Sequence, residues 1–367
     1  MVPTQLSGGI TFLACLGMAA CSAAPVSTGS HNPTGSSGAG NNGGNGYVPL
    51  STGGAPVSVV DGGRPPRCDD AGKCTCINIA EFGNTGQYGA VQGQDKSTAF
   101  QLWLNSMSTA HVDVFTQRIP ITVDLLSNYD VIILQSLSNN PSSTQQSDYW
   151  SYAPEEIATV QDWVQTKGGA IIALTGYFSD NSFEIGPTNQ LISFSGITYN
   201  ADDIILQPDC PLNPASNNQQ TCYCWGNSIP ITAWNPSDPI SKNVPAVGAF
   251  RGRSINAPSD ASIVATFNET SGPLAGHTYN VGVSVQKGNG RVFAYGDEWI
   301  TYNSQWDGST LTMPATSYDN PYDPCYNQRP TQVFNIPQLW YNALKWCAPL
   351  VSCLTITTTP EQQPIVN

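Results

Sequence analysis

The sequence has few charged residues, and basic residues are the scarcest of them. Only 11% of its 367 residues are Asp, Glu, Lys or Arg, against roughly 25% in a typical soluble protein. Lys and Arg total 13 against 26 Asp and Glu, which gives a net charge of −13. Since no basic cluster offsets this charge, the chain repels nucleic-acid phosphates and anionic lipid headgroups. We therefore expect neither nucleic acid nor a lipid surface to bind the folded part.

The N-terminal apolar run, Ile10–Ala20, is too short to span a bilayer as a helix. It ends in Met18-Ala19-Ala20-Cys21, which resembles the lipobox of bacterial lipoproteins, although Met18 stands where Leu is usual. The resemblance implies a signal peptide over residues 1–21, lipidation of Cys21 and anchoring in the outer membrane of a bacterial envelope. The membrane contact would then be made by the lipid alone. An ordinary secretory signal is the alternative.

The next segment, residues 22–66, consists largely of Gly, Ser, Asn, Thr and Pro. Such a composition buries too little apolar surface to offset the entropy of ordering the chain. We expect a flexible tether here. The patterning then predicts one folded domain over residues 67–353 and a short tail over residues 354–367.

Nine cysteines lie in the expected domain, and two Cys-x-Cys pairs among them suggest zinc binding. Structural zinc sites usually have Cys-x2-Cys spacing, however, and an exported protein matures where thiols oxidise. We therefore expect disulfides, with one cysteine left free or paired to another chain because the number is odd. The candidates are Cys68, Cys74, Cys76, Cys210, Cys222, Cys224, Cys325, Cys347 and Cys353.

Strand and helix patterns alternate in the first half of the expected domain. Val131–Leu134 and Ala170–Leu174 are continuous apolar runs, as expected of parallel strands covered on both faces. Between them, Pro154 and Gly168 delimit an amphipathic helix. An earlier unit has strands at 77–82 and 111–115 with a helix around 100–107. This alternation predicts an α/β fold with a doubly wound, mostly parallel sheet.

The second half is less regular. We expect a short helix at 190–194 and a disulfide-rich insertion of loops at about 202–245. Strands at 279–285 and 291–295 flank the turn Lys287-Gly288-Asn289-Gly290 and predict a C-terminal β-hairpin. A last helix is expected over 337–347.

Several of these segments together resemble the class I glutamine amidotransferase-like superfamily, in particular its non-amidotransferase, envelope-associated branches. They are the strand that follows Tyr129-Asp130, the helix-to-strand passage at Lys167-Gly168-Gly169, the segment 288–297 and the helix 339–346. The resemblance extends from Ile77 to Cys347. It implies a sheet of the flavodoxin or amidotransferase type.

Active members of that superfamily carry a nucleophilic Cys after a central strand and a His after a later one. Here residues 174–178, Leu-Thr-Gly-Tyr-Phe, contain neither Cys nor Ser, and residues 295–299 carry acids where the His would stand. A cysteine nucleophile needs a neighbouring base to keep its thiolate activated. We therefore expect no glutaminase activity and assign no catalytic residue.

Ligands of open α/β sheets bind beyond the carboxyl ends of the strands. The residues that the predicted strands place there are Glu81, Gln135, Thr175, Tyr177, Asp297, Glu298 and Trp299. Carboxylates beside amides and aromatic rings suit a sugar or polyol, and the same oxygens suit Ca²⁺. No other cofactor is indicated. In the structural alternative, Asp297 caps the segment after its strand, while Trp299 and Trp306 fill a core.

Three functions are compatible with these features. The leading hypothesis is a surface-tethered, non-catalytic domain that binds a glycan or another envelope component. The second is a carbohydrate hydrolase that uses Glu298 or Asp297 with Glu81, because glycosidases work with two carboxyl groups. The third is an assembly protein that binds a protein partner through the cysteine-rich insertion. The sequence carries no signal for an oligomeric state.

Overall fold

The computed structural model describes residues 67–68, 74–75, 77–84, 97–108, 112–140, 145–175, 183–204, 229–249, 252–269, 274–306 and 334–348. All of them belong to the second of two compact units, Leu50–Asn367. The expected signal peptide, the whole of the expected tether, residues 205–228 of the expected insertion and the tail lie outside these ranges. Within them, no helix has the length and apolar character needed to cross a membrane.

An eight-stranded sheet forms the centre of this unit, in the order β10-β13-β14-β15-β6-β5-β3-β4. Its parallel strands are β3 (Ile79–Gly83), β4 (Asp113–Phe115), β5 (Val131–Gln135), β6 (Ala170–Leu174) and β15 (Gly290–Tyr295). Its antiparallel strands are β10 (Ala233–Trp234), β13 (Ser262–Asn268) and β14 (Thr278–Lys287). Numbered along the chain, the parallel strands have the spatial order 2-1-3-4-5, which is the flavodoxin-like order. The α/β prediction, with its mostly parallel sheet, is confirmed.

Three two-stranded sheets accompany the central one. They are β1 (Arg67–Cys68) with β2 (Cys74–Thr75), β9 (Ile229–Ile231) with β11 (Val247–Ala249), and β7 (Thr198–Tyr199) with β12 (Ile255–Asn256). The predicted hairpin is formed by β14 and β15, which pair from Gly282↔Tyr295 to Lys287↔Gly290. Because β15 also pairs in parallel with β6, this hairpin joins the antiparallel strands to the parallel ones.

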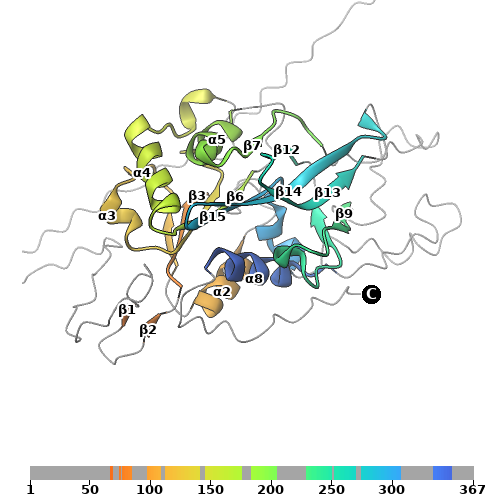
Figure 1. The fold of residues 1–367 in the computed structure, drawn as a ribbon, viewed down its shortest axis with the longest axis horizontal. Coiled ribbons are helices and arrows are strands. Elements are labelled where there is room, and N and C mark those ends of the chain that lie inside the picture. Colours follow the sequence, from red (N-terminus) through yellow and green to blue (C-terminus); the bar gives the residue numbers. More distant parts are fainter. Residues whose placement is uncertain are drawn as a thin grey trace, which may run out of the picture. The chain divides into compact units, whose positions relative to one another are not determined.

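Helices cover both faces of the central sheet (Figure 1). On one side lie α2 (Thr98–Ser108), α6 (Asn303–Trp306) and α8 (Ile336–Cys347), and on the other lie α3 (Val123–Leu126), α4 (Pro154–Gln165) and α5 (Ile185–Ile192). Short 3-10 turns are η1 (Gln146–Asp148), η2 (Ser193–Ser195), η3 (Pro239–Ser241) and η5 (Trp299–Thr301).

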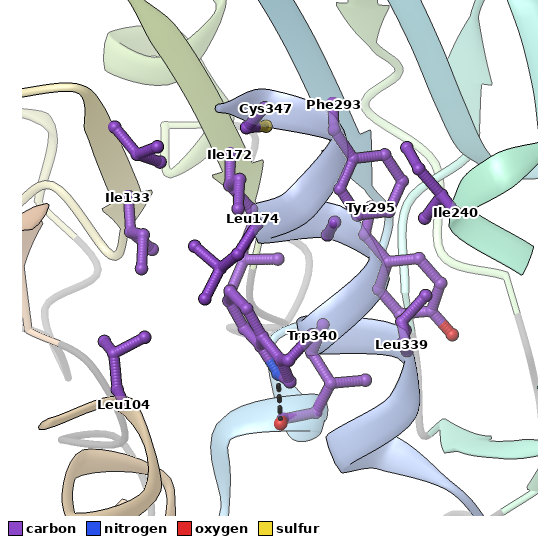
Figure 2. Packing of buried hydrophobic residues seen from close by; sticks show 14 of the residues in the cluster. Leu104, Ile133, Ile172, Leu174, Ile240, Phe293, Tyr295, Leu339, Trp340 and Cys347 are labelled. Atoms are coloured by element: carbon purple, nitrogen blue, oxygen red, sulfur yellow. Dashed lines mark hydrogen bonds between the residues drawn. The ribbon is translucent and has the colours of Figure 1, made fainter. Parts of the chain in front are cut away.

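Strand alternation distributes the apolar side chains between two cores. In β5, Val131 and Ile133 pack with α2 and α8, whereas Ile132 and Leu134 pack with α3, α4 and α5. Figure 2 shows the first core, where the Trp340 indole donates a hydrogen bond to the Ile300 carbonyl at 3.0 Å. Both faces of the parallel strands are thus apolar, which explains their continuous hydrophobic runs.

Helix α4 follows its sequence signals. It begins at Pro154, and the Glu156 carboxylate accepts hydrogen bonds from the backbone N–H groups of Ala153 (3.0 Å) and Ile121 (2.7 Å). After its end, Gly168 has a φ of 76°, which a glycine adopts without strain.

Two expectations about the middle of the chain need correction. The helix expected at 190–194 is α5, which begins at Ile185, and Ser193–Ser195 is a 3-10 turn that ends at Gly196. Pro187 obscured that start, but a helix tolerates proline in its first turn because the N–H groups there have no intrahelical partner. The segment 202–245 is not made only of loops, since Ala233–Trp234 joins the central sheet as an edge strand.

The cysteine predictions are mostly untested, because six of the nine positions lie outside the described residues and the side chains of Cys68 and Cys74 are likewise not described. Those two cysteines face each other in the backbone register of β1 and β2. Cys347 is a free thiol buried in the core under α8, which corrects its place among the disulfide candidates.

Candidate functional site

The order of the parallel strands reverses between β3 and β5, and the backbones at the ends of these two strands lie very close together. Gly83, at the end of β3, has a φ of 104°, and a Cβ there would lie 1.9 Å from the Gln135 carbonyl oxygen. The next residue, Asn84, donates its backbone N–H to that oxygen at 3.0 Å and its side-chain amide to the Ser138 carbonyl at 2.6 Å. Only glycine fits at position 83.

Glu298 is the centre of a buried hydrogen-bond network at the carboxyl edge of the sheet. Its Oε2 accepts from the Gln135 side-chain amide at 2.9 Å, and its Oε1 accepts from the Tyr302 hydroxyl at 2.5 Å. The same Gln135 amide reaches Thr301 Oγ1 at 3.3 Å. Gln135 Oε1 is buried and has no hydrogen-bond partner among the described residues. Side chains from the end of β5 and from the segment after β15 therefore form one buried polar cluster, in which one amide oxygen has no partner among the described residues.

Burial dominates the electrostatics of this network. Desolvation raises the pKa of Glu298 above its usual 4.5, although the hydrogen bonds from Tyr302 and Gln135 act to lower it. Desolvation also raises the pKa of Tyr302 well above 10, and the neighbouring Glu298 charge adds to that shift. A carboxyl group in this setting holds its proton more strongly than an exposed one.

Tyr149 and Glu184 extend the network. Desolvation raises the pKa of Tyr149, and the charges of Glu184 and Glu298 raise it further, while Arg253 opposes them. Arg253 is buried and donates its backbone N–H to the carbonyl of Gly296, two residues before Glu298.

Two partly exposed aromatic residues adjoin the acids in sequence and contact the tyrosines of this region. The ring of Phe183, directly before Glu184, is 37% exposed and has its centroid 6.5 Å from that of Tyr149. Trp299, directly after Glu298, is half-buried, with its ring centroid 5.4 Å from that of Tyr302. An aromatic face next to carboxylates combines apolar contact with hydrogen-bond acceptors.

The residues predicted from the sequence lie in different surroundings. Gln135 and Glu298 are in direct contact, as above. Asp297 accepts the Trp299 backbone N–H at 2.9 Å, which is the capping role of the structural alternative. Glu81 accepts from the Gln101 side chain at 2.6 Å, on the face covered by α2.

Two further predictions concern the turn after β6 and the packing of Trp306. Thr175 is buried at the end of β6 and Tyr177 lies outside the described residues. Trp306 fills the core between α2 and α8, as the structural alternative has it.

Sequence reasoning missed Tyr149, Glu184, Arg253, Thr301 and Tyr302. Tyr302 could have been found, because it stands four residues after Glu298 and that spacing brings side chains together on a helical turn. Thr301 likewise stands only three residues after Glu298. Tyr149, Glu184 and Arg253 come from segments far away in sequence, so no local pattern indicates them. No group of three or more His, Cys, Asp or Glu in the described part is placed to hold a metal ion.

No known protein family matches the sequence, and no curated protein is significantly similar to it. Among solved structures, the fold is similar to the mmIFT52 N-terminal domain, with 12% identity and a TM-score of 0.45 over 74% of this chain and 97% of that one.

Two other solved structures are similar to this chain at low identity. One is a putative ThuA-like protein from Bacteroides uniformis (13% identity, TM-score 0.39, 80% of this chain and 95% of that one). The other is a putative GMP synthase protein from Thermoplasma acidophilum (9% identity, TM-score 0.32, 60% and 82%). These likenesses assign neither a family nor a function to the chain.

Proposed function

We propose that the chain binds a glycan of the bacterial envelope at the carboxyl edge of its central sheet. The observation that carries this proposal is the buried Glu298 network, in which Gln135 Oε1 has no hydrogen-bond partner among the described residues. Sugar hydroxyl groups donate hydrogen bonds to carboxylate and amide oxygens. The missing nucleophile and histidine of the superfamily that the sequence resembles favour binding over amidotransferase chemistry.

The neighbouring rings support the same ligand class. Phe183 and Trp299, which adjoin Glu184 and Glu298 in sequence, are partly exposed. A pyranose has apolar C–H faces and polar edges, so it suits a site in which rings and acceptors converge.

The test is the thermal stability of the full chain with a panel of oligosaccharides and muropeptides, since a ligand that binds the native state raises its Tm. Wild type and Asp162→Asn, which changes an exposed carboxylate on α4, should show the same ligand-induced shift. Glu298→Gln should lose most of it. The proposal fails if no saccharide shifts wild type, or if Glu298→Gln responds as wild type does.

Hydrolysis of a carbohydrate is a second candidate, favoured by the raised pKa of Glu298. A glycosidase needs one carboxyl group that stays protonated as general acid, and burial favours this form. This candidate predicts turnover that Glu298→Gln abolishes while Tm changes little. Release of reducing ends from the panel above measures it, and inert wild-type protein rejects it.

We further propose that Cys21 is lipidated and that residues 22–66 tether the domain to the outer membrane. Metabolic labelling with a palmitate analogue in a bacterial host should mark wild type but not Cys21→Ala. Equal labelling of both, or none, would contradict the anchor. If no saccharide binds, assembly with a protein partner through 202–245 becomes the leading function, and pull-downs with Cys210–Cys224 deleted would test it.

A further inference from the structure

A groove of about 850 Å³ lies against edge strand β10, and none of its lining residues belongs to the Glu298 network. Its walls carry hydroxyl groups, amides, an indole and one ammonium group. The residues that matter here are Thr232, Trp234, Ser241, Lys242, Asn335 and Gln338. No carboxylate is among the described lining residues, although acids outnumber bases 26 to 13 in the chain. Lys242, which is exposed, is the one charged residue on this lining.

The backbone that carries Lys242 is held in place from two sides. The Asn342 side chain, on α8, donates to the carbonyl oxygens of Lys242 at 2.7 Å and of Ile240 at 2.9 Å. The Asp238 carboxylate accepts the Ile240 N–H at 2.9 Å and caps η3. The Gln338 amide, on the opposite wall, donates to Asn342 Oδ1 at 2.9 Å. One buried asparagine thus connects both walls, so the groove is preformed rather than assembled by a ligand.

The aromatic wall is equally fixed. The Trp234 indole donates its N–H to the Ile231 carbonyl at 2.8 Å. Its ring lies nearly parallel to that of Tyr295, at an angle of 5° and a centroid distance of 6.3 Å. Both contacts hold the half-buried indole in one orientation at the groove.

A buried hydroxyl group lies behind this wall. The Tyr295 hydroxyl has no hydrogen-bond partner among the described residues. Figure 2 shows it on the side of the core where Ile240 and Leu339 lie, and these two residues adjoin Ser241 and Gln338 of the groove in sequence. A buried polar group without a partner calls for an explanation such as a bound water or ligand.

We propose that this groove binds an acidic saccharide, a sugar that carries a carboxylate. Lys242 supplies the opposite charge, Trp234 supplies an apolar wall for a ring face, and Asn335 and Gln338 supply amides for hydroxyl groups. A cationic ligand would meet the like charge of Lys242, and a purely apolar one would displace water from the lysine and the amides without replacing its hydrogen bonds. The residues that line the groove are separate from those of the Glu298 network, so the groove is a second site that goes beyond the proposed function.

The test compares trigalacturonate with the neutral trisaccharide maltotriose on the full chain by calorimetry at low salt. Trigalacturonate should bind wild type and Lys167→Gln, which changes an exposed lysine after α4, with equal affinity. Lys242→Gln should bind it about tenfold more weakly, since a charge-assisted hydrogen bond is lost. Added salt should weaken binding to wild type, because an exposed ion pair is screened.

The location is tested separately by NMR. The indole N–H signal of Trp234, identified by its disappearance in Trp234→Phe, should shift on addition of trigalacturonate. Equal affinities for the two trisaccharides, no loss in Lys242→Gln, an unmoved Trp234 signal or no binding at all would each overturn the proposal. These outcomes leave the site at the Glu298 network untouched, because that site is tested by the Glu298→Gln variant, whereas the groove is tested by Lys242→Gln and the Trp234 signal.

Discussion

Oε2 of Glu298 lies 2.9 Å from Nε2 of Gln135, a residue 163 positions earlier in the chain. The bond joins the ends of β15 and β5, which do not pair with each other because β6 lies between them. The superfamily that the sequence resembles carries its nucleophile in the turn after a central strand, which corresponds here to the turn after β6. In this protein an amide from the end of β5 and a carboxylate that follows β15 are in mutual contact.

Glu298→Gln should remove a pH-dependent part of the stability. Because burial raises the pKa of Glu298 above 4.5 in the folded chain, the folded state binds this proton more tightly than the unfolded state. The stabilising contribution is complete below the ordinary pKa and is lost as pH rises through the raised value. Tm plotted against pH should therefore fall more steeply for wild type than for Glu298→Gln above about pH 4.5. Parallel curves would contradict a raised pKa.

Tyr302→Phe should destabilise the fold at neutral pH by about 1–3 kcal/mol, since it leaves a buried carboxylate oxygen without its 2.5 Å donor. It should also raise the pKa of Glu298 further, because the Tyr302 hydrogen bond acts to lower it. Urea unfolding and an NMR titration of the labelled carboxyl carbon measure the two effects. Tyr279→Phe, at a half-buried ring on β14, is the matched control and should change stability little. An equal effect of both variants would count against the network.

Gly83→Ala should destabilise the protein by about 1–3 kcal/mol or more through backbone strain alone. Its φ of 104° disfavours any side chain, and the new Cβ would meet the Gln135 carbonyl oxygen at 1.9 Å. Gly186→Ala is the matched control, because a Cβ there would meet nothing within 4 Å and the residue lies in helix α5. Chemical unfolding measures the stability of both variants. A Gly83→Ala variant as stable as wild type would mean that the ends of β3 and β5 approach each other less closely than described.

The Cys347 thiol should resist alkylation in the native protein. Desolvation raises its pKa to about 12, with the Arg291 charge acting in the opposite direction, so almost no thiolate exists at pH 8. Iodoacetamide should modify Cys347 only after denaturant is added, as read by mass spectrometry of the α8 peptide. Rapid native labelling, or recovery of Cys347 in a disulfide-linked peptide, would be incompatible with a buried free thiol.

Much of the fold follows from local pattern. The apolar runs that became β5 and β6 are continuous because helices cover both faces, and Pro154 and Gly168 lie at the two ends of α4 as expected. The hairpin of β14 and β15 follows from its glycine turn. Helix α5 was misplaced because Pro187 masked its first turn, and β10 was missed because two residues carry no periodicity.

The amino-acid sequence by itself determined the strand and helix alternation, the apolar strands and the set of polar residues at the strand ends, because these depend on local spacing and composition. Only the tertiary structure decided which of these residues meet. Gln135 contacts Glu298 while Asp297 caps a turn, and Tyr149 and Glu184 enter from elements that local pattern does not connect to the edge. Such contacts depend on the order of the strands and on burial, and burial also raises the pKa of Glu298. The spacing of neighbouring residues determines neither of these.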